Sequence, residues 1–299
     1  MGPGTVASPL RARRYDSWDW PRLLRHGYIV FVLAMSAVTI SGHGQTGMDG
    51  RAYWLSDLSH LYGLGSSHDD AFLYSPAFAE LVAPLTNLPW AWFLALLTMA
   101  NLAALWYLLG PWALPMLLFP VVSLELLMAN INLLITVAIV AGFRRPYLWG
   151  FVVLTKVTPG VGLLWFLVRR EWRSLGIALG ATLAVVAISA VIAPLLWAEW
   201  FGFIATASQP ITSGPDVPWE PPVAVPLLVR LPIAAIIIVY GALTDRPQCV
   251  PIGAAVAQPV IWGWTIALGA LPLMDWHRIW PRRAEVREPA AAWLAPSSE

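Results

Sequence analysis

Roughly nine apolar segments follow one another along this chain, separated by short polar turns. Hydrophobic residues make up 58% of its 299 residues and charged residues only 12%. A soluble domain does not carry so much apolar surface, so the pattern predicts an all-α integral membrane protein, a polytopic helical bundle. The segments cover residues 27–41, 74–88, 90–109, 111–127, 131–143, 147–168, 175–197, 223–241 and 250–274.

Several of these segments are shorter than the ~20 residues that a straight span needs, so we expect short broken or re-entrant helices among them. We divide the chain into a basic N-terminal segment (1–26), a transmembrane domain (27–274) and a polar C-terminal tail (275–299). Arginines are concentrated in the first segment and around 169–173, which by the positive-inside rule puts both in the cytoplasm. Loops 42–73 and 198–222 are then expected outside, while the side of the C-terminus stays open.

The net charge and the cysteine and tryptophan contents exclude some classes of function and favour others. A net charge of +1 argues against nucleic acid as a partner. The single Cys249 excludes an internal disulfide, and no ligand cluster indicates a metal, so we expect neither metal nor cofactor. Eighteen tryptophans fit rings at a membrane interface and stacking surfaces for sugars or lipids.

The first outer loop holds the densest group of titratable residues. Within it, apolar residues at helical spacing over 51–62 predict a short amphipathic helix on the outer membrane surface. Asp49, just before that helix, could take a proton from a substrate hydroxyl whose lipid tail stays in the bilayer. An acidic residue in an outer loop is more often merely solvated. Other acids of the loop are Asp57, Asp69 and Asp70.

Lys156 is the one lysine of the chain, and it lies inside an apolar run. An ammonium at membrane depth costs several kcal/mol unless it faces a partner or a watery cavity. Thr155, Thr158 and Pro159 around it predict a broken helix lining a cavity, where Lys156 would meet a phosphate or carboxylate. Alternatively, Lys156 reaches the interface from a short helix, or pairs with a buried acid such as Glu125.

Two amides, Asn130 and Asn132, interrupt another apolar run. They can hydrogen-bond substrate hydroxyls, or they can cross-link helices, which is the commoner role.

The order of these features resembles that of glycosyltransferase family 87, the polyprenol-phosphate-mannose-dependent mannosyltransferases of the GT-C superfamily. Members of that family have a pattern similar to Asp-x-x-x-Tyr after the first span, then Tyr-x-Pro at the start of the second span and Pro-Leu-x-x-Leu-Pro at its end. Gly-Gln-x-Asn follows, and then Lys-x-x-Pro ahead of a basic turn. The matching residues here are Asp49 with Tyr53, Tyr74 with Pro76, Pro84 to Pro89, Asn130 with Asn132, and Lys156 with Pro159.

The resemblance implies a GT-C bundle with an outer-face cavity at the cell membrane. It also implies inverting transfer of a hexose, mannose in particular, from a polyprenyl-phosphate sugar to a glycolipid or cell-wall glycan hydroxyl. Asp49 would be the base, and Lys156 or Arg51 would stabilise the departing phosphate. The other residues expected to bind substrate are Tyr53, Tyr74, Asn130, Asn132 and Trp262.

Two other functions remain open. Where the family has Gly-Gln, this chain has Ala129-Asn130, and Trp264 stands where a histidine is expected. These departures would suit a catalytically inactive homologue that acts as a membrane scaffold. A lipid or solute transporter could also use a lysine and broken helices along its path, but it predicts an internal repeat that the sequence does not display.

Overall fold

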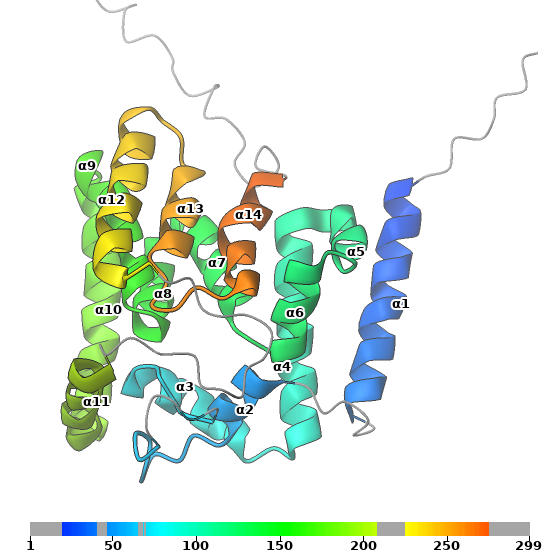
Figure 1. Cartoon of the computed structure of the whole chain (residues 1–299), viewed down its shortest axis with the longest axis horizontal. Coiled ribbons are helices and arrows are strands. Elements are labelled where there is room, and N and C mark those ends of the chain that lie inside the picture. The colour runs from blue at the N-terminus through cyan, green and yellow to red at the C-terminus, as the bar shows by residue number, and fades with distance from the viewer. Residues whose placement is uncertain (1–19, 41–46, 65–67, 69, 208–224, 275–299) are drawn as a thin grey trace, which may run out of the picture.

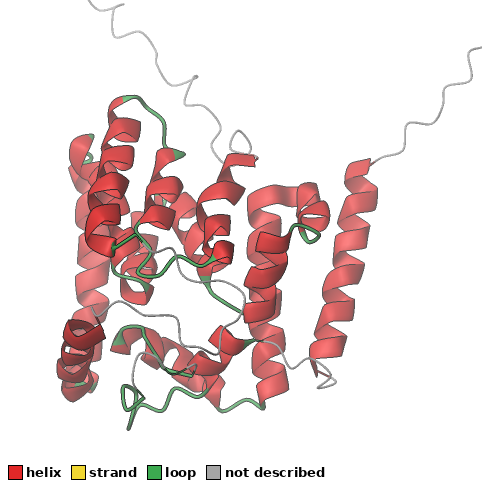
Figure 2. Ribbon diagram, in the orientation of Figure 1, coloured by secondary structure: helices red, strands yellow, loops and turns green. Residues whose placement is uncertain are grey.

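The computed structural model describes residues 20–40, 47–64, 68, 70–207 and 225–274, and every regular element in these ranges is helical (Figure 1 and Figure 2). The elements of the first half are α1 (Trp20–Ile40), α2 (Met48–Trp54), α3 (Pro76–Thr86), α4 (Trp90–Leu109), η1 (Gly110–Trp112), α5 (Ala113–Met116), α6 (Pro120–Met128) and α7 (Asn132–Gly142). Those of the second half are η2 (Pro146–Leu148), α8 (Trp149–Thr155), η3 (Thr158–Leu163), α9 (Leu164–Val168), α10 (Trp172–Ile192), α11 (Pro194–Ala207), α12 (Leu227–Leu243), α13 (Cys249–Val256), η4 (Gly263–Thr265) and α14 (Ile266–Met274). The predicted all-α class is confirmed.

Two helical stretches in the described residues are long and apolar enough to cross a membrane, Trp90–Met116 and Trp172–Ile192. A third crossing is obtained if α6 and α7 count as one span, since they are bent by 107° at a short break. Only 11% of the apolar stretch of α10 is buried inside the protein, so most of its surface faces outward, as a helix in lipid requires. The bundle therefore combines candidate spans with the expected broken helices.

Two backbone breaks place polar residues among the apolar helices. Between α6 and α7 the chain turns at Ala129, which adopts a left-handed conformation with φ 53°. Between α8 and η3 the backbone is extended at Lys156, with φ −136° and ψ 109°. The predicted break at Lys156 is thus confirmed. Breaks such as these free backbone and side-chain polar groups from the helical pattern and leave them available to one another.

Helix α2 packs against the first of these breaks. The Gly47 N–H donates to the Leu127 carbonyl over 2.7 Å, and Gly47 itself has φ 101°, which favours glycine. A Cβ on Gly50 would lie 2.9 Å from the Ala129 Cβ, closer than such atoms approach. The absence of a side chain at Gly50 therefore lets α2 approach the α6–α7 turn.

Aromatic side chains hold α2 and α3 together. The rings of Tyr53, Phe72, Tyr74 and Phe78 pack within a shared apolar cluster. At the start of α3 the Ser75 hydroxyl donates to the Leu154 carbonyl of α8 over 2.5 Å. Figure 1 shows α2 and α3 in a layer across the ends of α6 and α8. Asp49 lies on α2 in this layer and is therefore placed next to the two breaks.

Local structure differs from the expectation in some segments and agrees with it in others. The helix predicted over 51–62 ends at Trp54, because Asp57 accepts hydrogen bonds from the backbone and hydroxyl of Ser59 and so forms a turn in place of helix. The apolar segment 250–274 is not continuous but is divided at Gln258–Pro259. The segment 111–127, in contrast, is broken at its prolines into η1, α5 and α6, as its sequence predicts. Residues 198–207 of the expected outer loop are helical and belong to α11.

Candidate active site

Asp49 lies on α2 and is held by an amide from the α6–α7 turn. The Nδ2 of Asn130 donates to the Oδ2 of Asp49 over 2.6 Å. Asn130 is in turn fixed by Asn101 of α4, whose Nδ2 donates to the Asn130 carbonyl over 2.8 Å. Asn130 is 6% exposed, whereas Asp49 is half-buried. A buried amide therefore orients the carboxylate of a residue that is itself only partly buried.

Asn132 connects a second carboxylate to the lysine. Its backbone N–H and its Nδ2 donate to the two oxygens of Glu125 over 3.0 and 3.1 Å. Its Oδ1 accepts a hydrogen bond from the Lys156 Nζ over 2.7 Å. Glu125 and Asn132 are buried, while Lys156 is half-buried. Lys156 and Glu125 therefore both form hydrogen bonds with Asn132. Glu125, the acid considered above as a partner of Lys156, is thus linked to Lys156 through this amide.

The two amides are themselves linked, because the Asn132 N–H also lies 3.1 Å from the Asn130 Oδ1. A continuous chain of hydrogen bonds thus runs from Asp49 through Asn130 and Asn132 to Lys156. The two half-buried charged groups stand at its ends, and the buried amides lie between them. We call this set, with Glu125, the polar network.

Tyr53 and Tyr74 extend the face that carries Asp49. Tyr53 is four residues after Asp49 on α2, so both point to the same side of the helix. The two phenol oxygens are 2.8 Å apart, and the rings meet edge to face. Burial raises the pKa of both phenols, so both remain neutral hydroxyls that can donate hydrogen bonds.

Burial also raises the pKa of the Asp49 carboxyl above its ordinary value. The hydrogen bond from Asn130 and the charge of Lys156 act in the opposite direction. A carboxylate whose pKa is raised accepts a proton more readily than one in water. Burial therefore makes the Asp49 carboxylate a stronger base than a solvated aspartate.

The other acids of the first loop lie elsewhere. Asp57 is exposed, and the hydrogen bonds from Ser59 lower its pKa, which makes it a weaker base. Asp70 lies 3.2 Å from the Nε of Arg51 in an ion pair. Asp69 falls outside the described residues.

The structure brings together most of the expected binding residues. Arg51 is an exception, since it is exposed and held by Asp70 in an ion pair rather than by the polar network. Trp262 is half-buried just before η4, which packs against α6 next to the network. Sequence analysis missed Gly50, although a glycine directly after the candidate base was a signal of close helix packing.

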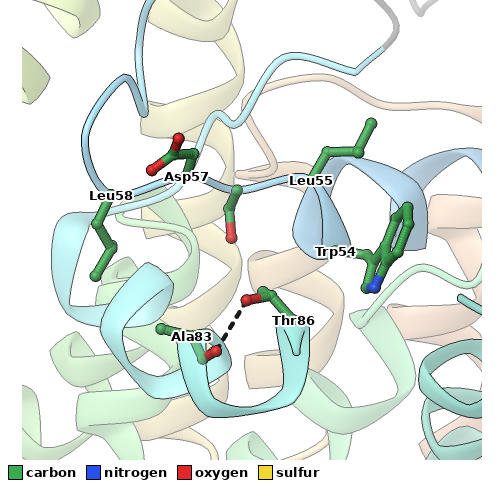
Figure 3. Close-up of a pocket in the computed structure, with 7 residues that line it drawn as sticks. Trp54, Leu55, Asp57, Leu58, Ala83 and Thr86 are labelled. Carbon is green, nitrogen blue, oxygen red and sulfur yellow. Dashed lines mark hydrogen bonds between the residues drawn. The ribbon is translucent and has the colours of Figure 1, made fainter. Parts of the chain in front are cut away.

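A separate hollow of about 450 Å³ opens where α2 ends and α3 passes beneath it (Figure 3). Its side chains come from residues 54–58 of the first loop and from α3, and neither Asp49 nor Lys156 lines it. The ring of Trp54 lies at one side, and the Thr86 hydroxyl donates to the Ala83 carbonyl at the bottom. This hollow adjoins the layer that carries Asp49 without reaching the polar network.

In the described part of the chain, no group of three or more His, Cys, Asp or Glu side chains is placed to hold a metal ion. The polar network offers two carboxyl groups, two amides and one ammonium. This set can take a proton, hydrogen-bond hydroxyls and neutralise an anion, and these are the operations of a group transfer between oxygen atoms.

Comparison with known proteins gives a match to a protein family. The family model described as glycosyltransferase family 87 matches residues 72–296, which include Asn130, Asn132 and Lys156. Neither a curated protein nor a solved structure matches the chain. Asp49, Arg51 and Tyr53 precede the matched residues, so their part in the site rests on the geometry above. The match covers well over half of the chain, and the candidate spans and every member of the polar network except Asp49 lie inside it. The chain belongs to glycosyltransferase family 87.

Proposed function

We propose that this membrane glycosyltransferase transfers mannose from a polyprenyl-phosphate sugar to a hydroxyl of a glycolipid or cell-wall glycan, with inversion at the anomeric carbon. Asp49 is the base in this proposal, and Lys156 faces the phosphate. The donor lipid and the acceptor approach from the bilayer, and the reaction takes place at the outer face of a multi-pass cell-membrane protein whose N-terminus is cytoplasmic. No resident metal or cofactor takes part in the proposed reaction.

The observation that carries the proposal is the hydrogen bond of 2.6 Å from Asn130 to Asp49. It occupies one carboxylate oxygen and thereby fixes the direction of the other. Because Asp49 is half-buried, that second oxygen can meet a substrate hydroxyl while remaining in a partly dry environment. A positioned carboxylate of this kind is what general-base catalysis requires.

The proposed reaction is a single displacement. The acceptor oxygen attacks the anomeric carbon, and its proton passes to the free oxygen of Asp49. The bond between the anomeric carbon and the phosphate oxygen breaks, and its electron pair stays on the polyprenyl phosphate. One displacement from the face opposite to the leaving group inverts the configuration.

Lys156 supports the departure of the phosphate in this proposal. Its Nζ donates one hydrogen bond to Asn132, and an ammonium has three donors, so two remain for an anion. Fixed positive charge next to a leaving group that gains negative charge lowers the barrier, most of all where water is excluded. Asn132 holds the ammonium in place for this purpose.

The experiment that tests the function uses purified full-length protein in detergent. It is incubated with radiolabelled polyprenyl-phosphate-mannose and membrane lipid extracts, and new labelled glycolipids are sought. The proposal expects a labelled product whose anomeric configuration is opposite to that of the donor. Binding of the donor without transfer to any extract would favour an inactive scaffold instead. A product that retains the donor configuration would exclude the single displacement.

A further inference from the structure

One end of the bundle gathers exposed arginines from two separate turns of the chain. The turns lie together because Phe143, directly after α7, packs its ring edge to face on Trp165 of α9, with the centroids 5.4 Å apart. Beyond the first turn, η2 also packs against α10. The four exposed arginines are Arg144 and Arg145 in the turn after α7, Arg170 in the turn between α9 and α10, and Arg173 in the first turn of α10. We call these four residues the basic patch.

The acids at this end of the bundle are paired with another arginine. The Nε of Arg169 lies 3.1 Å from the Oε1 of Glu171, and its Nη1 lies 2.9 Å from the Oδ1 of Asp245. Among the described residues, no acid forms an ion pair with any of the four arginines of the basic patch. Their positive charges are therefore not neutralised by the protein, and the patch favours an anionic partner.

The basic patch lies where a helix that faces outward begins. Helix α10 starts at Trp172 and has 21 residues, so it is roughly 30 Å long, which matches the hydrocarbon thickness of a bilayer. Only 11% of its apolar stretch is buried inside the protein, as expected for a helix surrounded by lipid. A helix of this length places its first turn, with Arg173, at the level of the lipid headgroups of one leaflet.

Aromatic side chains next to the basic patch agree with this depth. Tyr147 of η2 and Trp172 of α10 are each more than half exposed. Tyrosine and tryptophan are enriched at the membrane interface, where the ring meets the hydrocarbon and the polar atom meets the headgroups. The planar guanidinium of arginine matches the geometry of a phosphate and is only weakly hydrated. The patch thus combines interfacial rings with cations that suit a phospholipid headgroup.

We propose that the basic patch binds the headgroups of anionic phospholipids. In the orientation proposed above, these lipids belong to the cytoplasmic leaflet. Figure 1 shows α9 at one end of the bundle and the layer of α2 and α3 at the other, so headgroups bound at the patch hold the layer of Asp49 toward the opposite face of the membrane. The inference concerns the surrounding bilayer, and it does not depend on the identity of the donor or the acceptor.

The test titrates full-length protein in a neutral detergent with short-chain phosphatidylglycerol, which is anionic, or with phosphatidylcholine of the same chain length, which has no net charge. We expect the wild-type protein to bind phosphatidylglycerol more tightly, and we expect added salt to reduce this preference. Arg144→Gln with Arg145→Gln should weaken phosphatidylglycerol binding by roughly tenfold or more, because each basic residue near the headgroups contributes to the attraction. Arg170→Gln with Arg173→Gln should have the same effect, and neither pair should change the affinity for phosphatidylcholine.

Two controls accompany these variants. Arg144→Lys with Arg145→Lys keeps the charge and should retain most of the preference, and Arg51→Gln, at an exposed arginine of α2, should change neither affinity. The two glutamine pairs lie on different turns, so one pair still tests the inference if the other does not fold. Equal affinity of the wild-type protein for the two lipids would overturn the inference. So would an undiminished preference for phosphatidylglycerol in the folded glutamine variants, since the anionic lipid would then bind elsewhere.

Discussion

Asn132 accepts a hydrogen bond from Lys156 over 2.7 Å, and the same side chain donates to the buried carboxylate of Glu125 over 3.1 Å. One amide thus orients a cation at the break after α8 and an anion on α6. Removing Lys156 leaves the Glu125 carboxylate buried without a nearby positive charge.

The variant Lys156→Gln should therefore have two effects that can be measured independently, one on donor binding and one on the stability of the fold. We expect donor affinity or turnover to fall by at least ~1.5 kcal/mol, about tenfold, since a charge-assisted hydrogen bond to phosphate is lost. If the variant is poorly folded, Lys156→Gln with Glu125→Gln should recover stability, because neither charge is then left alone. Donor affinity in the folded protein is the measurement. Unchanged affinity and turnover would make Lys156 purely structural.

The pH dependence of turnover should report Asp49. The base must be ionised, so turnover falls as the pH drops through the pKa of Asp49, which burial raises. The hydrogen bond from Asn130 lowers that pKa, and Asn130→Ala removes it. The acid limb of the kcat profile should therefore move to higher pH in Asn130→Ala. Asn87→Ala, at an exposed helix end, is the control and should leave the limb in place. A limb that does not move in Asn130→Ala would contradict the assignment.

Gly50→Ala tests whether close packing of α2 positions the base. The new Cβ would lie 2.9 Å from the Ala129 Cβ, so α2 must shift by a few tenths of an ångström. A small displacement of a catalytic group has a large effect on rate, and we expect turnover to fall by roughly tenfold or more with little change in melting temperature. Gly63→Ala meets nothing closer than 3.4 Å and should be silent. Equal turnover in the two variants would show that α2 tolerates the shift.

Cysteine labelling in a Cys249→Ser background tests the orientation in the membrane. The exposed Ser59 lies in the loop that we place outside, and the exposed Arg170 lies in the turn that we place in the cytoplasm. An impermeant reagent should label Ser59→Cys in intact cells and Arg170→Cys only after the membrane is opened. The reverse pattern would show that the protein has the opposite orientation.

The sequence predicted the helical class and the break at Lys156 because both depend on local composition. Long apolar runs require helices in lipid, and Thr, Pro and Gly next to a lysine disfavour a continuous helix. It also placed Trp90–Leu109 with its observed bounds, since proline or glycine flanks both ends. The helix expected over 51–62 failed because the side chain of Asp57 competes with the backbone, which apolar spacing does not reveal.

The sequence predicted which residues belong to the candidate site, but it did not predict how their side chains contact one another. Order along the chain indicated Asp49, Asn130, Asn132 and Lys156, and the structure joins them by hydrogen bonds. Their connection depends on a turn at Ala129 and on the approach of Gly50, which are contacts between distant segments. The ion pair of Arg51 with Asp70 likewise depends on how the loop folds back, so sequence alone left Arg51 among the binding residues.

The most direct test of the account is the rate of mannose transfer by Asp49→Asn, measured with radiolabelled polyprenyl-phosphate-mannose beside the wild-type protein and Asp57→Asn. An amide keeps the shape of the carboxylate but cannot take the proton. The account predicts a well-folded Asp49→Asn protein whose turnover is lower by roughly 10²–10⁴-fold, with Asp57→Asn close to wild type. Near-normal turnover in folded Asp49→Asn would contradict the assignment of Asp49 as the base.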